Sequence, residues 1–267
     1  MRIGIGLLLV MTALLAACSS APQRPARGEF VERELRVDGQ VHRYQVFVPA
    51  PAAASDKPPV ILFLHGSGER GDDNQRQVAV GLGPQVRRQA DTFPAIVVFP
   101  QVPENGEWNQ VVDVTFAQLD AATREFGGDP DRTYLTGLSM GGYGAWELAL
   151  RQSYRFAAVV PVCGGLVHPR RTTMAVTVVA DEADPYAAVA QRLRDMPVWM
   201  FHGAKDDLVP PDYSRRLEAA FRAAGARDVR YTEFPDANHN SWDPAYATPE
   251  LWDWLFAQRQ ANAFRQE

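Results

Sequence analysis

Ser139 lies among small residues in the stretch TGLSMGG, directly after a short apolar run and before a stretch with helical spacing. The pattern G-x-S-x-G between a strand and a helix is typical of a nucleophile elbow, a sharp turn that lifts a serine hydroxyl above the edge of a sheet. Gly137 and Gly141 leave room where the strand and the helix pass closely. Because a serine hydroxyl is a weak nucleophile near neutral pH, this interpretation also requires a base, an acid and a site for an oxyanion.

A histidine later in the chain is the candidate base. His239 stands in the polar stretch DANHNSW, after the last expected strand and before the helical stretch TPELWDWLFAQ. A loop position lets an imidazole reach across the edge of the sheet, so we expect His239 to accept the serine proton. A surface histidine without a catalytic role is the alternative interpretation.

Two neighbouring aspartates are candidates for the acid that orients this imidazole. Asp206 and Asp207 occur in HGAKDDLVP, directly after the apolar run PVWMF. A carboxylate at the C-terminal end of a strand can hold the imidazole and stabilise its cationic form. Either aspartate gives the chain order Ser, Asp, His, which is the order of the α/β-hydrolase arrangement.

The stretch LFLHGSGERG follows another apolar run, and its glycines let backbone amides approach a reacting carbonyl oxygen. We assign the oxyanion hole to the backbone N–H groups of Ser67 and Met140, the latter being the residue after the serine. His65 is expected to position this loop, and His202 to have a similar structural role in the acid loop.

The elements that must position these residues follow from the hydrophobic pattern. Stretches with helical spacing alternate with short apolar runs that indicate strands. The runs are residues 41–48, 60–64, 95–99, 133–136, 156–162, 198–201 and 229–234. This alternation predicts an α/β fold with a mostly parallel central sheet and helices on both faces, with residues 41–48 as an outer antiparallel strand.

Length, composition and charge limit the classes of function. The 267 residues are 46% hydrophobic and 22% charged, which fits one catalytic domain over residues 30–267. The formal net charge of −5 becomes −6 if the leader that contains Arg2 is removed. The chain therefore offers no basic field, which argues against a nucleic-acid partner.

The N-terminus has the layout of a secretory leader over residues 1–17. The letters LAAC, which end at Cys18, resemble the lipobox of bacterial lipoproteins, and this resemblance implies a lipid anchor on Cys18. Because Ser19 stands where Asp would be needed for inner-membrane retention, the same resemblance implies a protein of the bacterial cell envelope, at the outer membrane and facing the periplasm or the exterior. Residues 18–29 are rich in Pro and Arg and are expected to form a flexible tether. An ordinary cleaved leader with an incidental cysteine is the alternative.

The second cysteine, Cys163, ends the apolar run AAVVPVC and is expected to be a small buried hydrophobe. With Cys18 acylated, the chain has no pair of thiols for an intramolecular disulfide. The sequence offers no convincing metal-ligand cluster, and the predicted chemistry needs neither a metal nor an organic cofactor.

Five motifs together resemble those of a known family. They are LFLHGSGERGDDN, FPQVPENGEWN, DPDRTYLTGLSMGGYGAWELAL, FHGAKDDLVP and NHNSW, and the resemblance covers residues 28–258. The family comprises the α/β-hydrolase esterases of the phospholipase/carboxylesterase and dienelactone-hydrolase-like groups, with the bacterial predicted peptidases and prolyl-oligopeptidase-like hydrolases. The resemblance implies a triad of Ser139, Asp206 and His239. It favours Asp206 over Asp207, because the pattern H-G-x-x-D-x-x-V-P places the acid four residues before the proline, here Pro210.

The resemblance implies a serine hydrolase that forms an acyl-enzyme but does not name the substrate. A hydrolase of carboxylic esters, including acylated sugars or feruloyl-type esters, is the first expectation, so the expected partner is a small-molecule ester. A serine peptidase of the prolyl-oligopeptidase-like type is the alternative. A non-catalytic envelope lipoprotein that binds ligands on a hydrolase scaffold is a third interpretation.

Two tryptophans and one insert are candidates for shaping the pocket. Trp108 and Trp242 are expected to line it or to pack beside it. The family passes quickly from a stretch like PVCGG to the strand before the acid, whereas here residues 166–195 intervene. This insert, with a further strand predicted over residues 174–180, is expected to form either a cap beside the site or a surface excursion.

Overall fold

The computed structural model describes residues 27–168 and 171–260. The predicted leader over residues 1–17, Cys18 and most of the predicted tether lie outside the described residues. The first strand begins at Glu29, one residue inside the predicted tether, and the N–H of Gly28 donates to the carbonyl of Ala90 at 3.2 Å. Within the described part, none of the helices combines the length and the apolar character that crossing a bilayer requires.

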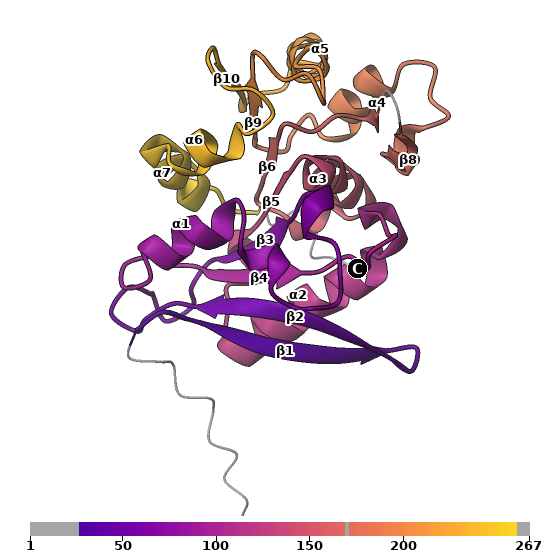
Figure 1. Ribbon diagram of the computed structural model, residues 1–267. Helices are drawn as coiled ribbons and strands as arrows, with labels where there is room; N and C mark the ends of the chain where they lie inside the picture. The colour runs from indigo at the N-terminus through magenta and orange to yellow at the C-terminus, as the bar shows by residue number, and fades with distance from the viewer. Residues whose placement is uncertain (1–26, 169–170, 261–267) are drawn as a thin grey trace, which may run out of the picture.

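A twisted eight-stranded sheet forms the centre of the molecule (Figure 1). In spatial order its strands are β1 (Glu29–Val37), β2 (Gln40–Val48), β4 (Ile96–Pro100), β3 (Val60–Leu64), β5 (Thr133–Leu138), β6 (Ala158–Val162), β9 (Val198–Gly203) and β10 (Val229–Phe234). The pairs of β1 with β2 and of β2 with β4 are antiparallel, and the other pairs are parallel. The predicted mostly parallel sheet is confirmed, and the predicted strand over residues 41–48 is antiparallel, but it lies one strand inside the edge, which β1 forms.

The edge strand β1 was not among the predicted strands. Its sequence EFVERELRV alternates apolar and charged residues, and both of its faces are exposed or half-buried. Charged side chains of this kind protect an edge strand from pairing with other chains. They also interrupt the apolar run by which a buried strand is predicted. Asp38 and Gly39, with φ of 50° and 78°, form the two-residue turn into β2.

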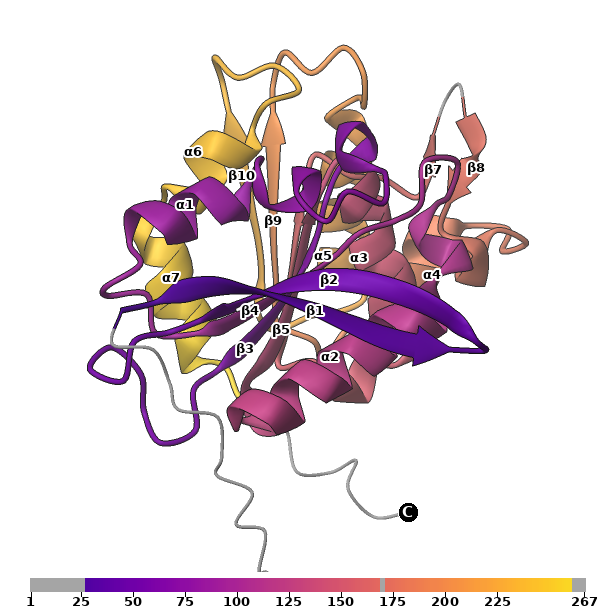
Figure 2. The same ribbon diagram turned by 60° about the horizontal axis from the view of Figure 1, so that its bottom comes forward.

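Helices cover both faces of the sheet (Figures 1 and 2). One face carries α2 (Val112–Phe126), α3 (Met140–Arg151), α4 (Pro185–Arg192) and α5 (Asp212–Ala223), and the other carries α1 (Leu82–Arg88), α6 (Trp242–Tyr246) and α7 (Pro249–Ala257). The fully buried strand β3 contributes side chains to the hydrophobic cores on both faces of the sheet. Its residues Val60, Leu62 and Leu64 pack into the first core, and Ile61 and Phe63 pack into the second. This explains why the strand reads as an unbroken apolar run.

The insert over residues 166–195 forms a small unit of its own. It contains a two-stranded sheet of β7 (Val167–His168) and β8 (Arg171–Ala175), a 3-10 turn η6 (Thr177–Val179) and helix α4. The strand predicted over residues 174–180 was therefore wrong, because β8 ends at Ala175. The chain turns at Thr177, whose N–H and hydroxyl both donate to Glu147 of helix α3 at 2.6 Å.

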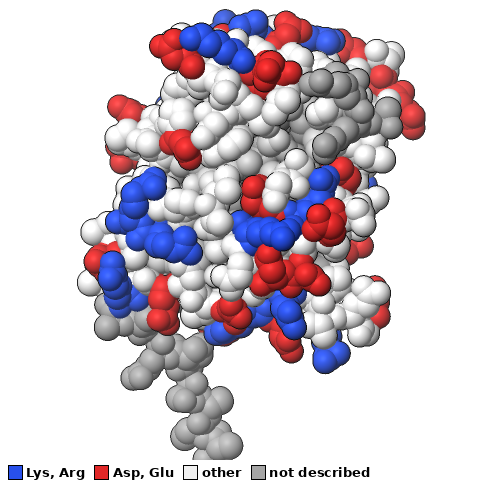
Figure 3. All heavy atoms as spheres, viewed as in Figure 1, with Lys and Arg blue, Asp and Glu red and all other residues white. Residues whose placement is uncertain are grey.

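Both signs of charge are spread over the surface. On the face drawn in Figure 3, Lys and Arg side chains lie interspersed with Asp and Glu side chains. Ion pairs of the described residues include Arg33 with Glu125 at 2.7 Å and Arg76 with Asp73 at 2.9 Å. Ion pairs at the surface contribute little to stability. The net charge of the chain is −5, and the face in Figure 3 shows no large patch of one sign of charge.

Candidate active site

Ser139 occupies a strained turn between β5 and α3. Its backbone has φ 52° and ψ −118°, a conformation that costs a residue with a side chain on the order of 1–3 kcal/mol. The surrounding glycines allow the turn. A Cβ atom on Gly137 would lie 2.2 Å from the carbonyl oxygen of Gly141, and one on Gly141 would lie 1.9 Å from that of Leu64. The predicted elbow is thus present, with strand and helix in backbone contact.

Three side chains from distant parts of the sequence meet at the C-terminal edge of the sheet. Ser139 Oγ lies 2.9 Å from His239 Nε2, and His239 Nδ1 lies 2.7 Å from Asp206 Oδ2. The serine follows β5, the aspartate follows β9 and the histidine follows β10. The structure therefore joins the three residues that the sequence singled out in one hydrogen-bonded line.

The structure places Asp206, and not its neighbour Asp207, against the imidazole. Asp206 is buried, whereas the side chain of Asp207 is exposed. The second carboxylate oxygen of Asp206, Oδ1, accepts hydrogen bonds from the backbone N–H groups of Leu208 at 3.0 Å and Val209 at 2.9 Å. These bonds fix the carboxylate so that Oδ2 faces His239.

Hydrogen bonds keep Asp206 ionised. Burial by itself raises the pKa of this carboxyl, but the bonds from His202, His239 and the Val209 N–H outweigh it and hold the pKa well below its usual range. His202 is buried and braces the acid loop, as predicted: Nδ1 lies 2.8 Å from Ser214 Oγ and Nε2 lies 2.9 Å from the carbonyl oxygen of Val209. The base thus faces a fixed negative charge.

His65 holds the loop of residues 66–71, which carries the predicted oxyanion donor Ser67 and is called the oxyanion loop below, in the predicted structural role. Its Nε2 accepts from the N–H of Val102 at 3.0 Å, and its Nδ1 donates to the carbonyl of Gly66 at 2.6 Å. Burial lowers the pKa of His65 to about 4, so the ring is neutral near pH 7. A neutral ring with both nitrogens engaged has no capacity to act as a base.

Two backbone donors stand beside Ser139. Ser67 begins the 3-10 helix η1 (Ser67–Glu69), and Met140 begins α3, so neither N–H has a carbonyl partner within its own helix. Among the described residues, the remaining backbone hydrogen bonds include none from these two groups. A Cβ on Gly66 would lie 3.6 Å from Ser139 Cβ, which places this loop directly against the serine.

The two tryptophans lie beside the site in different ways. Trp108 is buried beneath the oxyanion loop, where Nε1 donates to the carbonyl of His65 at 3.1 Å and the two rings lie 4.9 Å apart. The ring of Trp242 stands perpendicular to that of His239 at 5.6 Å and supports the base loop. Trp108 also lines a cleft, so this residue both packs against the oxyanion loop and forms part of a cleft wall.

Cys163 lies directly behind the triad, which the sequence did not indicate. The thiol is fully buried, as predicted, and its sulfur lies within 4.8 Å of the nearest ligand atoms of Asp206 and His239. Burial raises the pKa of Cys163, so it remains a neutral thiol. Beside this thiol, His239 Nδ1 and Asp206 Oδ2 bond to each other at 2.7 Å.

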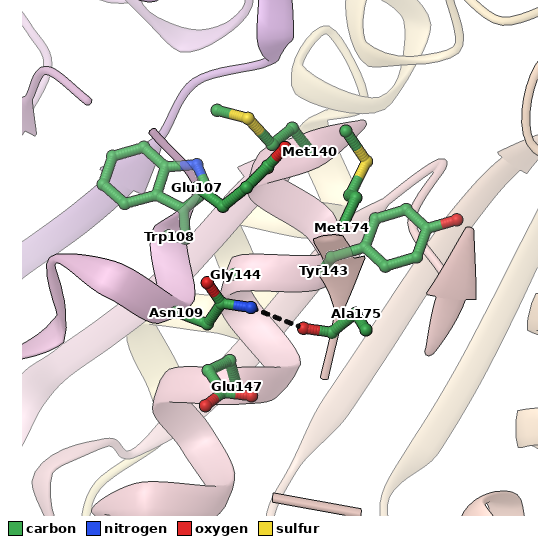
Figure 4. Close-up of a pocket in the computed structure, with 9 residues that line it drawn as sticks. All are labelled: Glu107, Trp108, Asn109, Met140, Tyr143, Gly144, Glu147, Met174 and Ala175. Carbon is green, nitrogen blue, oxygen red and sulfur yellow. Dashed lines mark hydrogen bonds between the residues drawn. The ribbon is translucent and has the colours of Figure 1, made fainter. Parts of the chain in front are cut away.

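A small cleft opens beside Met140, between the segment Glu107–Asn109 before α2, helix α3 and the insert (Figure 4). It is lined by Glu107, Trp108, Asn109, Met140, Tyr143, Gly144, Glu147, Met174 and Ala175. Sequence reasoning named only Trp108 and Met140 of this set. Glu107 belongs to the quoted motif NGEWN, but its burial depends on an ion pair with Arg70 of the oxyanion loop, which no local pattern reveals.

The fold and the site together define an α/β-hydrolase: a mostly parallel sheet, a serine at the β5–α3 turn, an acid after β9 and a histidine after β10. The chain belongs to the prolyl oligopeptidase family, whose family model, Peptidase_S9, matches residues 105–260. The fold and the family resemblance predicted from the motifs are confirmed.

Three similar proteins illustrate this relationship. Esterase LipQ of Mycobacterium tuberculosis is 49% identical over 43 residues, which are 16% of this chain and 10% of that protein. A solved thermostable esterase is 30% identical, with 86% of this chain and 63% of that chain covered at a TM-score of 0.67. A solved ferulic acid esterase, 19% identical, shares the fold over 86% of this chain and 97% of its own at a TM-score of 0.63. The chain thus spans less than two thirds of the length of the first two proteins.

Proposed function

We propose that this chain is a serine hydrolase that cleaves carboxylic esters through an acyl-enzyme. The observation that carries the proposal is the hydrogen-bonded line from Ser139 Oγ to His239 Nε2 at 2.9 Å and from His239 Nδ1 to Asp206 Oδ2 at 2.7 Å. This is the arrangement that converts a serine hydroxyl into a nucleophile. The similarity to proteins described as esterases supports the same class of substrate.

In the first half of the reaction, Ser139 Oγ attacks the carbonyl carbon of the ester as its proton moves to His239 Nε2. The carbonyl electron pair moves onto oxygen, and the N–H groups of Ser67 and Met140 donate to the resulting oxyanion. When the carbonyl reforms, the bond to the alcohol oxygen breaks. His239 gives its proton to the departing oxygen, which leaves as the alcohol.

In the second half, water takes the place of the alcohol. His239 accepts a proton from the water as its oxygen attacks the acyl carbon, and collapse of the second tetrahedral intermediate breaks the bond to Ser139 Oγ. The proton returns to the serine, and the carboxylic acid leaves. Asp206 remains ionised throughout, because its hydrogen bonds hold its pKa low, and it stabilises the imidazolium in both halves.

A serine peptidase is the second candidate, because the family to which the chain belongs carries the name of prolyl oligopeptidase. Amide hydrolysis would use the same residues, with His239 protonating the leaving amine. We expect kcat/KM for 4-nitrophenyl acetate and acylated sugars to exceed kcat/KM for short peptides by orders of magnitude. Faster cleavage of the peptides would replace the esterase proposal with the peptidase.

A variant of the nucleophile tests the mechanism. Ser139→Ala is expected to lower kcat for 4-nitrophenyl acetate by about 10⁴-fold or more. Ser153→Ala, a matched change in the turn before β6, is expected to leave kcat unaltered. Full activity in Ser139→Ala would contradict the proposal. Inactivity of the unaltered protein on the whole panel would favour a binding protein on a hydrolase scaffold.

We also propose that the protein is anchored in the bacterial cell envelope, at the outer membrane, by a lipid on Cys18. The support is the sequence LAAC at the end of an apolar leader. The Cys18→Ser variant is expected to move from the membrane fraction to the soluble fraction of the envelope. An unchanged distribution would refute the anchor and leave the hydrolase proposal intact.

A further inference from the structure

Glu69 of the oxyanion loop places a carboxylate beside the nucleophile. A Cβ atom on Gly66 would lie 3.0 Å from Glu69 Oε2 and 3.6 Å from Ser139 Cβ, so the carboxylate and the serine flank the same point of the loop. The backbone of Glu69 is fixed there, because its N–H donates to the carbonyl of Gly66 at 3.3 Å and its own carbonyl accepts from Gln101 Nε2 at 3.1 Å. The ester cleavage described above makes no use of this carboxylate.

The charge of Glu69 has no cationic partner within residues 27–168 and 171–260. Its neighbour Arg70 pairs with Glu107 at 2.6 Å instead. Burial raises the pKa of Glu69, and the groups that lower it are the backbone N–H groups of Gly66 and of Glu69 itself. A half-buried carboxylate without a cation destabilises the protein, and a cation that arrives with a ligand removes this penalty.

The carboxylate of Glu69 is accessible from the site. The residue is half-buried, and neither of its side-chain oxygens is among the sealed polar atoms that lack a hydrogen-bond partner. Among the described side chains, none donates a hydrogen bond to these oxygens. A substrate group that lies over Ser139 can therefore reach them.

Glu69 lies on the side of the nucleophile that carries the base. The same point beside Gly66 is 2.8 Å from Leu138 Cδ1, and Leu138 belongs to the core beneath α1, α6 and α7. Trp242, whose ring stands against that of His239, packs on this core too. Glu69 and the base loop therefore lie over the same face of the sheet.

The departing alcohol of an ester belongs on this side as well, because His239 gives its proton to the leaving oxygen. The small cleft beside Met140 lies over the other core, with Trp108 and Tyr143 in its wall (Figure 4). The carboxylate of Glu69 is thus placed to face the alcohol part of an ester.

We propose that Glu69 binds a positively charged ammonium group in the alcohol part of the substrate. The preferred substrates are then esters of cationic amino alcohols, in which two methylene groups separate the ammonium from the ester oxygen. This inference rests on the proposed function, since it requires an ester that acylates Ser139. It assigns Glu69 as a specificity-determining residue.

Two acetate esters of the same shape test the proposal on the unaltered protein. Acetylcholine carries a trimethylammonium group, and 3,3-dimethylbutyl acetate carries a neutral tert-butyl group in its place. Each kcat/KM is divided by the rate constant for hydroxide hydrolysis of the same ester, which removes the difference between the leaving groups. We expect the corrected ratio to favour the choline ester by about tenfold or more, the effect of one close charge pair at a half-buried site. Equal corrected values would overturn the proposal.

A second pair of esters tests the assignment to the alcohol part. L-Alanine methyl ester carries its ammonium in the acyl part, and methyl isobutyrate is its neutral counterpart. We expect this pair, corrected in the same way, to differ less than the two acetates. A preference for the alanine ester without one for the choline ester would overturn the assignment.

Variants separate recognition of the cation from support of the loop. Glu69 is the third residue of η1, a position from which a side-chain oxygen can brace the N–H of Gly66. Glu69→Gln keeps such an oxygen and removes the charge, so the corrected ratio of the two acetates is expected to fall to about one. Asp72→Asn removes one charge from the exposed acid that follows the loop and is expected to keep the ratio.

An equal loss for both acetates in Glu69→Gln would show that Glu69 is only a brace, and the proposal would fail. Should this variant misfold, the two pairs of esters on the unaltered protein decide.

A fluorophosphonate probe distinguishes failure of this inference from failure of the proposed function. Labelling of Ser139 without any preference for the choline ester would overturn the assignment of Glu69 alone. Absence of labelling on folded protein would overturn the hydrolase proposal, and with it the assignment of Glu69.

Discussion

Replacing Asp206 by asparagine changes the hydrogen-bond pattern at the base without changing its shape. In the native protein Oδ1 accepts from the N–H groups of Leu208 and Val209, and Oδ2 faces His239 Nδ1 at 2.7 Å. An asparagine keeps its oxygen toward the two N–H groups, because the flipped amide would set donors against donors. Its NH₂ group then faces His239 Nδ1.

This arrangement forces the wrong tautomer on the base. With Nδ1 accepting from the amide, the imidazole proton moves to Nε2, and Nε2 loses the lone pair that must take the proton of Ser139. We expect kcat for 4-nitrophenyl acetate to fall by about 10⁴-fold, which corresponds to about 5.4 kcal/mol of transition-state stabilisation. Thermal unfolding should show that the fold persists, since both backbone bonds to Oδ1 remain.

The neighbouring residue provides the matched control. Asp207→Asn makes the same chemical change at an exposed side chain and is expected to keep kcat within about twofold. A loss below tenfold in Asp206→Asn, in protein that is folded by circular dichroism, would refute the role of Asp206. An equal loss in both variants would show that the loop matters and not the carboxylate that faces His239.

Three further predictions concern stability. Gly137→Ala places a Cβ 2.2 Å from the carbonyl oxygen of Gly141 and should lower the free energy of unfolding by at least about 4 kcal/mol in urea titrations, whereas Gly68→Ala, with open space around it, should stay within about 0.5 kcal/mol. His65 has a folded-state pKa of about 4, below the ordinary 6.5, so the unfolded chain takes up the proton first as pH falls. Stability should drop by about 3 kcal/mol between pH 6.5 and 4, and this part of the loss should disappear in His65→Asn. Glu147→Gln weakens the two 2.6 Å bonds to Thr177 and should speed amide hydrogen exchange in η6, while unchanged exchange would show that the insert is held elsewhere.

Local patterns predicted those parts of the molecule whose structure depends on local residues. The apolar runs VILFL and PVWMF correctly predicted buried parallel strands. The stretch TGLSMGG correctly predicted the elbow, because a strand and a helix that pass this closely leave no room for a Cβ atom at Gly137 or Gly141. Strand β1 was not predicted, because the charged residues that suit an edge strand interrupt its apolar pattern. The strand predicted over residues 174–180 failed because Thr177 bonds to Glu147, thirty residues earlier in the chain.

In the site, too, local motifs predicted some features, whereas features that depend on long-range contacts were missed. The motif H-G-x-x-D-x-x-V-P favoured Asp206 over Asp207, and the structure places Asp206 against the base. The place of Cys163 behind the triad and the ion pair of Arg70 with Glu107 depend on long-range packing, so no local pattern predicts either. The pocket was therefore the least predictable part of the site, although the residues of the triad were named in advance.

Mass spectrometry of the protein after treatment with a fluorophosphonate tests the central claim most directly. The account predicts one covalent adduct, located on Ser139 by peptide mapping, formed by the unaltered protein and slowed by orders of magnitude in His239→Ala. An adduct on another residue, or none at all on protein in which the 2.9 Å contact of Ser139 Oγ with His239 Nε2 is intact, would contradict it.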